Sequence, residues 1–193
     1  MSSPHAISAL PEDALAEMRE PLSPTGILIA AWGVFGVVGL LSQAAARLTP
    51  YAIEAIHVGM NAWQWLLLVI WTAMNAYGEG YRAFQLRFAP RVVVRSIYLA
   101  RHPRWHHVML APAFCMSLFH ATRRGKLVAY GTIAMVLCFI MLLRITPQPW
   151  RGIVDAGVVL PLVWGAVALI VLFFRAVRGS VPKAPYSLPP PSP

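Results

Sequence analysis

Four long apolar runs dominate the chain and predict its helices. They occupy residues 26–46, 57–77, 127–143 and 153–174, and polar or proline-containing segments separate them. Apolar runs of roughly 18 or more residues are typical of helices that cross a membrane. The pattern therefore predicts an all-α integral membrane protein with four transmembrane helices arranged as two hairpins.

A fifth apolar stretch, at 107–121, is too short for a full crossing. Its uninterrupted part, Val108 to Phe119, would form roughly 18 Å of helix, whereas the hydrocarbon core of a bilayer is about 30 Å thick. Pro112 weakens a helix in this stretch further, because proline lacks the backbone N–H. We expect a re-entrant or interfacial segment that leaves the membrane on the side from which it entered.

The distribution of basic residues favours the same topology. If the short stretch does not cross, only Arg47, Arg144 and Arg151 of the sixteen Lys and Arg residues face the outside. A crossing would divide the charges almost evenly, although Lys and Arg normally collect in cytoplasmic loops. We therefore expect a bacterial-type inner membrane protein with both termini in the cytoplasm.

These expectations divide the chain into five segments. A cytoplasmic N-terminal tail with a short amphipathic helix (1–25) precedes the first hairpin (26–78). A basic cytoplasmic connector (79–126), which includes the short apolar stretch, leads to the second hairpin (127–174). A proline-rich, disordered tail (175–193) ends the chain.

The connector holds a predicted amphipathic helix that starts at Pro90 and continues through residue 101. A basic amphipathic helix beside a span usually lies in the head-group plane, where its cations meet anionic lipids. The arginines in and around this helix are the predicted surface for lipids or a partner: Arg82, Arg87, Arg91, Arg95, Arg104, Arg123 and Arg124.

Composition narrows the class of partner. Hydrophobic residues make up 58% of the chain and charged residues 12%, yet the formal net charge is +9. A basic balance can indicate nucleic acid, but here the charges flank apolar runs. Anionic lipid head groups and another membrane protein subunit are therefore the expected partners, and nucleic acid is not.

Polar residues recur along one face of the second apolar run, at spacings of 4, 3, 8, 3 and 4 residues, with Leu68 in the gap. Polar side chains in hydrocarbon are costly and face a bundle interior or a water-filled cavity. Two interpretations stay open, a path for a transported solute and interhelical hydrogen bonds that fix packing. The stripe comprises His57, Asn61, Gln64, Thr72, Asn75 and Glu79.

One ion pair is predicted at the start of the fourth run. Asp155 lies in the first turn of this run, where the positive end of the helix dipole favours a carboxylate. Arg151 precedes Asp155 by four residues, so the two side chains share one helix face. We expect this pair to lie near the membrane surface.

The stretch IYLARHPRW, at 97–105, resembles the Tyr…Arg-His-Pro-x-aromatic segment of the isoprenylcysteine and phospholipid methyltransferase families. The resemblance implies that Arg101, His102 and Pro103 would contact S-adenosylmethionine. Those families also use a pair of glutamates in a following segment. Asp155 is the sole acid after residue 103, so that pair has no counterpart here.

The histidines form two weaker patterns. His102, His106 and His107 resemble one histidine box of membrane di-iron desaturases, but such enzymes need several boxes. His106 and His120 are spaced like the paired haem ligands of b-type cytochromes, but the opposing pair is missing. We predict no catalytic residue, metal site or cofactor, and haem and S-adenosylmethionine stay open as alternatives.

Three functions follow from these observations. The leading expectation is a non-enzymatic assembly, scaffold or accessory subunit with a basic cytoplasmic surface. The second is a small transporter or channel component that uses the polar stripe of the second run. The third is a membrane-bound enzyme, methyltransferase-like or haem-binding, that uses the Arg-His-Pro stretch.

Overall fold

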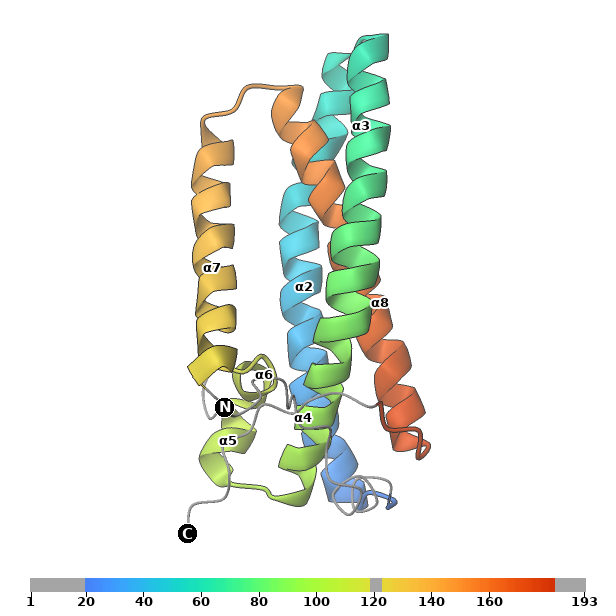
Figure 1. Cartoon of the computed structure of the whole chain (residues 1–193), viewed down its shortest axis with the longest axis vertical. Coiled ribbons are helices and arrows are strands. Elements are labelled where there is room, and N and C mark those ends of the chain that lie inside the picture. Colours follow the sequence, from blue (N-terminus) through green and yellow to red (C-terminus); the bar gives the residue numbers. More distant parts are fainter. Residues whose placement is uncertain (1–19, 119–122, 183–193) are drawn as a thin grey trace, which may run out of the picture.

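The computed structural model describes residues 20–118 and 123–182, and all regular elements within these ranges are helices (Figure 1). The predicted N-terminal helix and the residues after 182 lie outside the described residues. The helices are α2 (Pro24–Val58), α3 (Ala62–Asn75), the π-helix η1 (Ala76–Phe88), α4 (Ala89–Arg101), α5 (Trp105–Met109), α6 (Ala111–Cys115), α7 (Arg123–Arg144) and α8 (Trp150–Val177).

Two of these helices are long and apolar enough to cross a membrane. They are α2, with 35 residues, and α8, with 28 residues. At a rise of about 1.5 Å per residue they measure roughly 52 and 42 Å, more than the hydrocarbon thickness of about 30 Å. Helix α7 has a shorter apolar part, Ala129–Arg144. The all-α class is confirmed, because every regular element among the described residues is a helix.

The core is a bundle of α2, α8 and the unbroken rod formed by α3, η1 and α4 (Figure 1). Small residues set its register, because they let the helix backbones approach closely. A Cβ at Gly152 would overlap Ala55 of α2, and a Cβ at Gly157 would overlap Trp71 of α3. Phe84 of η1 packs directly against Gly165. Helix α2 therefore runs antiparallel to α8, whereas the rod runs parallel to α8.

The predicted loop at 47–56 is wrong, because α2 continues through it to Val58. Pro50 lies inside the helix, where its missing N–H removes one backbone hydrogen bond. Nearby, the Thr49 hydroxyl donates a hydrogen bond of 2.8 Å to the Ala45 carbonyl. The helix ends only at Gly59, whose φ of 87° is rarely adopted by other residues.

The predicted basic helix is present as α4, but it does not lie in the head-group plane. It packs lengthwise against α2 and α8, and the residues from Val92 to Ile97 are all buried. A Cβ at Gly26 of α2 would meet Ala100 of α4 at 3.7 Å. The valines of α4 thus fill the protein core and do not contact lipid.

The described part of the stretch 107–121 forms α5 and α6, two helices of five residues each. They lie at the end of the bundle where α2 begins (Figure 1). Pro112 of α6 packs directly against Gly36 of α2, and Cys115 packs against Gly33. The stretch is therefore folded back against the bundle over its described residues.

Helix α7 stands apart from the bundle (Figure 1). The residues from Tyr130 to Leu142 are all exposed, and most of them are large and apolar. At its first end the Tyr130 hydroxyl donates a hydrogen bond of 3.0 Å to the carbonyl of Leu118. An apolar helix with an uncovered circumference is stable only in lipid or against another protein.

Candidate functional site

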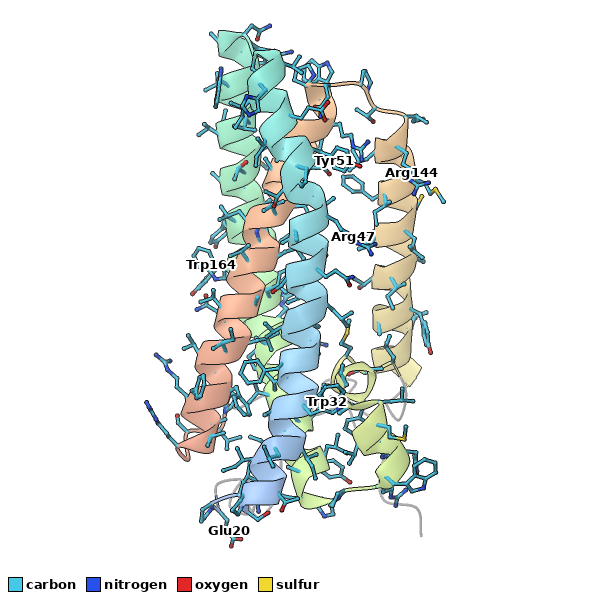
Figure 2. All side chains as sticks on the ribbon, turned by 180° about the vertical axis from the view of Figure 1, so that it is seen from behind. Glu20, Trp32, Arg47, Tyr51, Arg144 and Trp164 are labelled. Atoms are coloured by element: carbon cyan, nitrogen blue, oxygen red, sulfur yellow. The ribbon has the colours of Figure 1, made fainter. Side chains whose placement is uncertain are left out.

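A polar face runs along the second half of α2. Its residues recur at spacings of 4, 3, 4 and 3, which places them on one side of a helix. Figure 2 shows Arg47 on the side of α2 that faces α7. A shallow depression of about 650 Å³ lies beside this face and shares Pro50, Glu54 and His57 with it. The exposed members of the polar face are Gln43, Arg47, Pro50, Glu54 and His57.

The helix contacts place Arg47 level with the middle of α8. The rings of Phe35 and Phe173 meet at 5.8 Å between centroids, which fixes the register at one end. Arg47 lies twelve residues beyond Phe35, and Pro161 of α8 lies twelve residues before Phe173, so both are about 18 Å of helix from that contact. Arg47 is therefore level with Pro161, near the middle of α8.

The loop between α7 and α8 closes the upper end of this polar face. The Gln148 amide nitrogen donates hydrogen bonds to Glu54 Oε2 at 3.0 Å and to the Tyr51 carbonyl at 3.2 Å. The Gln148 amide oxygen accepts from the backbone N–H of Gly152 at 3.1 Å. One glutamine side chain thus ties α2 to the first turn of α8.

The predicted ion pair between Arg151 and Asp155 is confirmed, with 3.6 Å between Arg151 Nε and Asp155 Oδ2. The guanidinium carbon also lies 3.5 Å from the centroid of the Tyr51 ring. Asp155 is only 1% exposed, so the carboxylate is more deeply buried than the sequence suggested. Neither carboxylate oxygen has a hydrogen-bond donor among the described residues. Arg151 is therefore its main source of stabilisation.

The predicted stripe on the second run does not form one face. His57 belongs to α2, and Asn61 and Gln64 form a capping box at the start of α3. The Asn61 side chain accepts from the Gln64 N–H at 2.9 Å, and the Gln64 side chain accepts from the Asn61 N–H at 3.0 Å. The polar side chains of these two residues therefore bond to the backbone at the start of α3.

The rest of that stripe is divided between α3 and η1. Asn75 donates a hydrogen bond of 2.8 Å to the Trp71 carbonyl of its own helix, whereas the hydroxyl of Thr72 is buried without a partner among the described residues. Glu79 is exposed, and its neighbour Gly80 packs on Pro161 of α8. The wider turns of η1 rotate Glu79 away from the face that an α-helix would give it.

Arg95 was expected on a lipid or partner surface, and that prediction is wrong. Its side chain is 0% exposed, and Nε donates a hydrogen bond of 2.8 Å to the Phe114 carbonyl. The guanidinium carbon lies 4.3 Å from the centroid of the Phe114 ring. Burial lowers the pKa of Arg95 to about 10, so the group is still charged at neutral pH. Arg95 therefore anchors α6 to α4.

The remaining predicted arginines do not make one platform. Arg82 and Arg87 are exposed on η1, whose Phe84 packs beside the middle of α8. Arg91 is half-buried, and its Nε donates to the Arg87 carbonyl at 2.7 Å. Arg104 is exposed between α4 and α5, and the side chains of Arg123 and Arg124 lie outside the described set. The positive charge is thus spread along the bundle.

The Arg-His-Pro stretch lies at the end of α4. Arg101 donates a hydrogen bond of 2.6 Å to the backbone carbonyl of Glu20, and His102 stacks on Tyr98 with 4.8 Å between ring centroids. Pro103 is exposed. These contacts are internal to the fold and stabilise the turn after α4.

The neighbouring histidines also pack locally. The rings of His106 and His107 meet at 4.3 Å, and buried His107 stacks on Phe114 at 5.1 Å. His120 lies outside the described residues. Among residues 20–118 and 123–182, no group of three His, Cys, Asp or Glu side chains is placed to hold a metal ion.

The sequence prediction missed the polar face of α2 because it ended the first helix before Arg47. The regular spacing of Gln43, Arg47, Glu54 and His57 was a usable signal, but residues 47–56 were expected to form a short loop. No protein family, curated protein or solved structure matches the chain. The candidate site is therefore defined by the packing and charge of these residues.

Proposed function

We propose that this chain is a multi-pass inner-membrane protein that acts as an assembly or accessory subunit. In this proposal a transmembrane helix of a partner protein lies between α2 and α7, and a carboxylate of that helix pairs with Arg47. The observation that carries the proposal is the exposure of Arg47 at the level of the middle of α8. Ionisable residues inside a bilayer usually pair with another group or mark a functional site.

The cost of placing the Arg47 charge in a membrane favours a protein partner. An arginine at the centre of a membrane helix costs about 2.5–3.5 kcal/mol on insertion scales. A partner carboxylate within contact distance offsets much of this cost, because charge pairs are stronger where water is excluded. The partner would also cover the apolar side chains of α7, which are exposed from Tyr130 to Leu142. Close packing with small or matching side chains drives such association in lipid.

The proposed topology is two hairpins with both termini in the cytoplasm. Antiparallel packing of α2 against both the rod and α8 is compatible with this arrangement. The position of Arg175 supports it, because the last turn of α8 lies at the end of the bundle where the antiparallel helix α2 begins. Basic residues at that end agree with a cytoplasmic side, although the basic surface is smaller than the sequence suggested.

The structure gives less support to the other two functions. A transport path along the second run would need the stripe that His57, Asn61 and Gln64 no longer form. A methyltransferase site would need Arg101 and His102 to be available, whereas both make internal contacts. An assembly function uses exposed residues that are not involved in these internal contacts.

Site-specific photocrosslinking in native membranes tests the proposal. A photoreactive amino acid replaces Gln43 on the polar face or Ile140 on α7, and the control probe replaces Val69, which is exposed on α3. We expect a protein adduct of one defined mass from the first two positions and none from the third. Peptides from the adduct should carry an Asp or Glu within an apolar segment.

Charge variants at Arg47 make the test specific. Arg47→Glu should abolish the adduct because it repels a carboxylate, while Arg47→Lys should retain it because it keeps the charge. Equal adducts from Gln43 and Val69, or an adduct that survives Arg47→Glu unchanged, would overturn the proposal. Chromatographic profiles of the variants show whether each is folded before the adducts are compared.

A further inference from the structure

A second surface feature lies on the other pair of elements, between the rod and α8. It is a groove of about 720 Å³ that η1 and the start of α4 line on one side and α8 lines on the other. Leu86 and Pro90 belong to the first wall, and Val163, Val167 and Val171 belong to the second. Val167 and Leu86 are each 54% exposed, so the apolar wall is open along its length.

The two ends of the groove differ in chemistry. Towards the Leu160 end the Trp164 indole N–H donates a hydrogen bond of 2.7 Å to Gln85 Oε1, so these two atoms are partners of each other. At the other end Arg175 lines the groove and is exposed. Arg178 follows three residues later and is exposed as well. A ligand that fits both ends has an apolar body and an anionic head.

The length of the groove matches one leaflet of a bilayer. Its lining on α8 runs from Leu160 to Arg175, and the fifteen residue steps between them rise by roughly 22 Å. Half of a hydrocarbon core of about 30 Å is roughly 15 Å, which leaves room for the head-group region at the Arg175 end. Arg175 is in the last turn of α8, where the helix leaves its apolar part.

We propose that this groove binds one acyl chain of an anionic glycerophospholipid, with the lipid phosphate against Arg175. The inference depends on α8 crossing the membrane and is independent of the partner helix between α2 and α7. The phosphate oxygens accept hydrogen bonds from the guanidinium, which suits phosphate because its donors are planar and paired. A net negative lipid is favoured over a zwitterionic one because Arg178 adds a second positive charge at this end.

Native mass spectrometry of the purified full-length protein tests the inference. The protein is titrated with phosphatidylglycerol or with phosphatidylcholine of the same acyl chains. We expect one tightly bound phosphatidylglycerol and weaker binding of phosphatidylcholine. Arg175→Gln should weaken phosphatidylglycerol binding by about fivefold, since one basic residue near anionic lipid contributes about 1 kcal/mol. Arg178→Gln is the matched control and should have the smaller effect.

A second variant tests the apolar part of the groove. Val167→Trp places a large ring in the groove and should remove tight binding of both lipids, while Val69→Trp, on an exposed part of α3, should not. Phosphatidylglycerol binding that survives both Arg175→Gln and Val167→Trp would overturn the inference. A dimer mass that disappears with Val167→Trp would overturn it too, because a second copy would then occupy the groove.

The two proposals fail in different ways. Arg47→Glu should leave phosphatidylglycerol binding unchanged, because Arg47 does not line this groove. Arg175→Gln should leave the photocrosslink from Gln43 unchanged. Loss of the lipid result alone therefore contradicts the groove, and loss of the crosslink alone contradicts the partner helix.

Discussion

The contact between Gly36 and Pro112 gives a sharp prediction about how the short apolar stretch is held. A Cβ at Gly36 would overlap Pro112 Cγ, and it would lie 3.0 Å from Pro112 Cβ and 3.6 Å from Cδ. Carbon atoms pack best at about 3.5–4.0 Å, so Gly36→Ala must push α6 away from α2. Gly39, almost one helix turn further along α2, has nothing within 4 Å of the same position and is the matched control.

The two substitutions should change the free energy of unfolding in opposite directions. Overpacking of this kind costs about 1–3 kcal/mol, and alanine regains up to about 1 kcal/mol over glycine inside a helix. The free energy of unfolding should therefore fall by about 1–2 kcal/mol for Gly36→Ala and rise by up to about 1 kcal/mol for Gly39→Ala. The two variants therefore differ by about 1–3 kcal/mol, which at roughly 2–4 °C per kcal/mol for a chain of this size separates their unfolding midpoints by about 2–12 °C.

Thermal unfolding of the purified protein in mild detergent measures this difference through its tryptophan fluorescence. The double variant Gly36→Ala/Pro112→Ala adds a specific control, because removal of the proline ring takes away the atoms that the new methyl group meets. We expect the double variant to recover most of the stability lost in Gly36→Ala. Equal midpoints for Gly36→Ala and Gly39→Ala, or no recovery in the double variant, would refute the packing of α6 on α2.

Three further predictions concern buried groups. Arg95→Met should lower the free energy of unfolding by about 1.5–3 kcal/mol, measured by the same thermal assay, because the Phe114 carbonyl loses a charged donor, and Arg95→Lys should lose less. Arg151→Met should cost about 2–3 kcal/mol, below the range for a wholly buried pair because Arg151 is 22% exposed, and Arg151→Met/Asp155→Leu should recover most of it. Cys115 should resist maleimide near neutral pH in the folded protein and react after denaturation, because burial raises the pKa of its thiol to about 12. Mass spectrometry measures the labelling. Rapid labelling of the folded protein would contradict the 1% exposure of Cys115.

The sequence predicted the second pair of long helices well. The expected ranges 127–143 and 153–174 lie within α7 and α8, which extend a few residues further at each end. Apolar runs bounded by arginine and proline identify such helices because the polar residues mark where hydrocarbon ends. The Arg151–Asp155 pair was equally accessible to sequence reasoning, since a spacing of four residues fixes the geometry within one helix.

The first half of the chain was harder to predict for physical reasons. Pro50 breaks most helices, so the sequence indicated a loop where α2 continues. The π-helical turns of η1 change the angle between successive residues, and apolar periodicity does not reveal them. Both errors moved polar side chains to the wrong face, and the stripe that begins at His57 was the result.

The depth of Arg47 could not be predicted from the sequence because it depends on distant contacts. Phe35 against Phe173 and Ala55 against Gly152 align α2 with α8, and each contact joins residues about a hundred positions apart or more. The burial of Arg95 depends in the same way on Phe114 and on the fold of α6. Local patterns identify the helices, whereas their register decides which charges lie beside apolar partners.

Measuring how deep the polar face of α2 lies in a lipid bilayer tests the proposed position of Arg47 most directly. A nitroxide label on Ala46→Cys, in a protein without its own cysteines, keeps Arg47 in place, and its accessibility to oxygen and to a water-soluble nickel complex reports its depth. Labels at Val163 in the middle of α8 and at Trp150 near its start give the two reference depths. We expect the label at 46 to match the label at 163 in its accessibility to oxygen and to the nickel complex. A label at 46 that is as accessible to nickel as the one at 150 would contradict it.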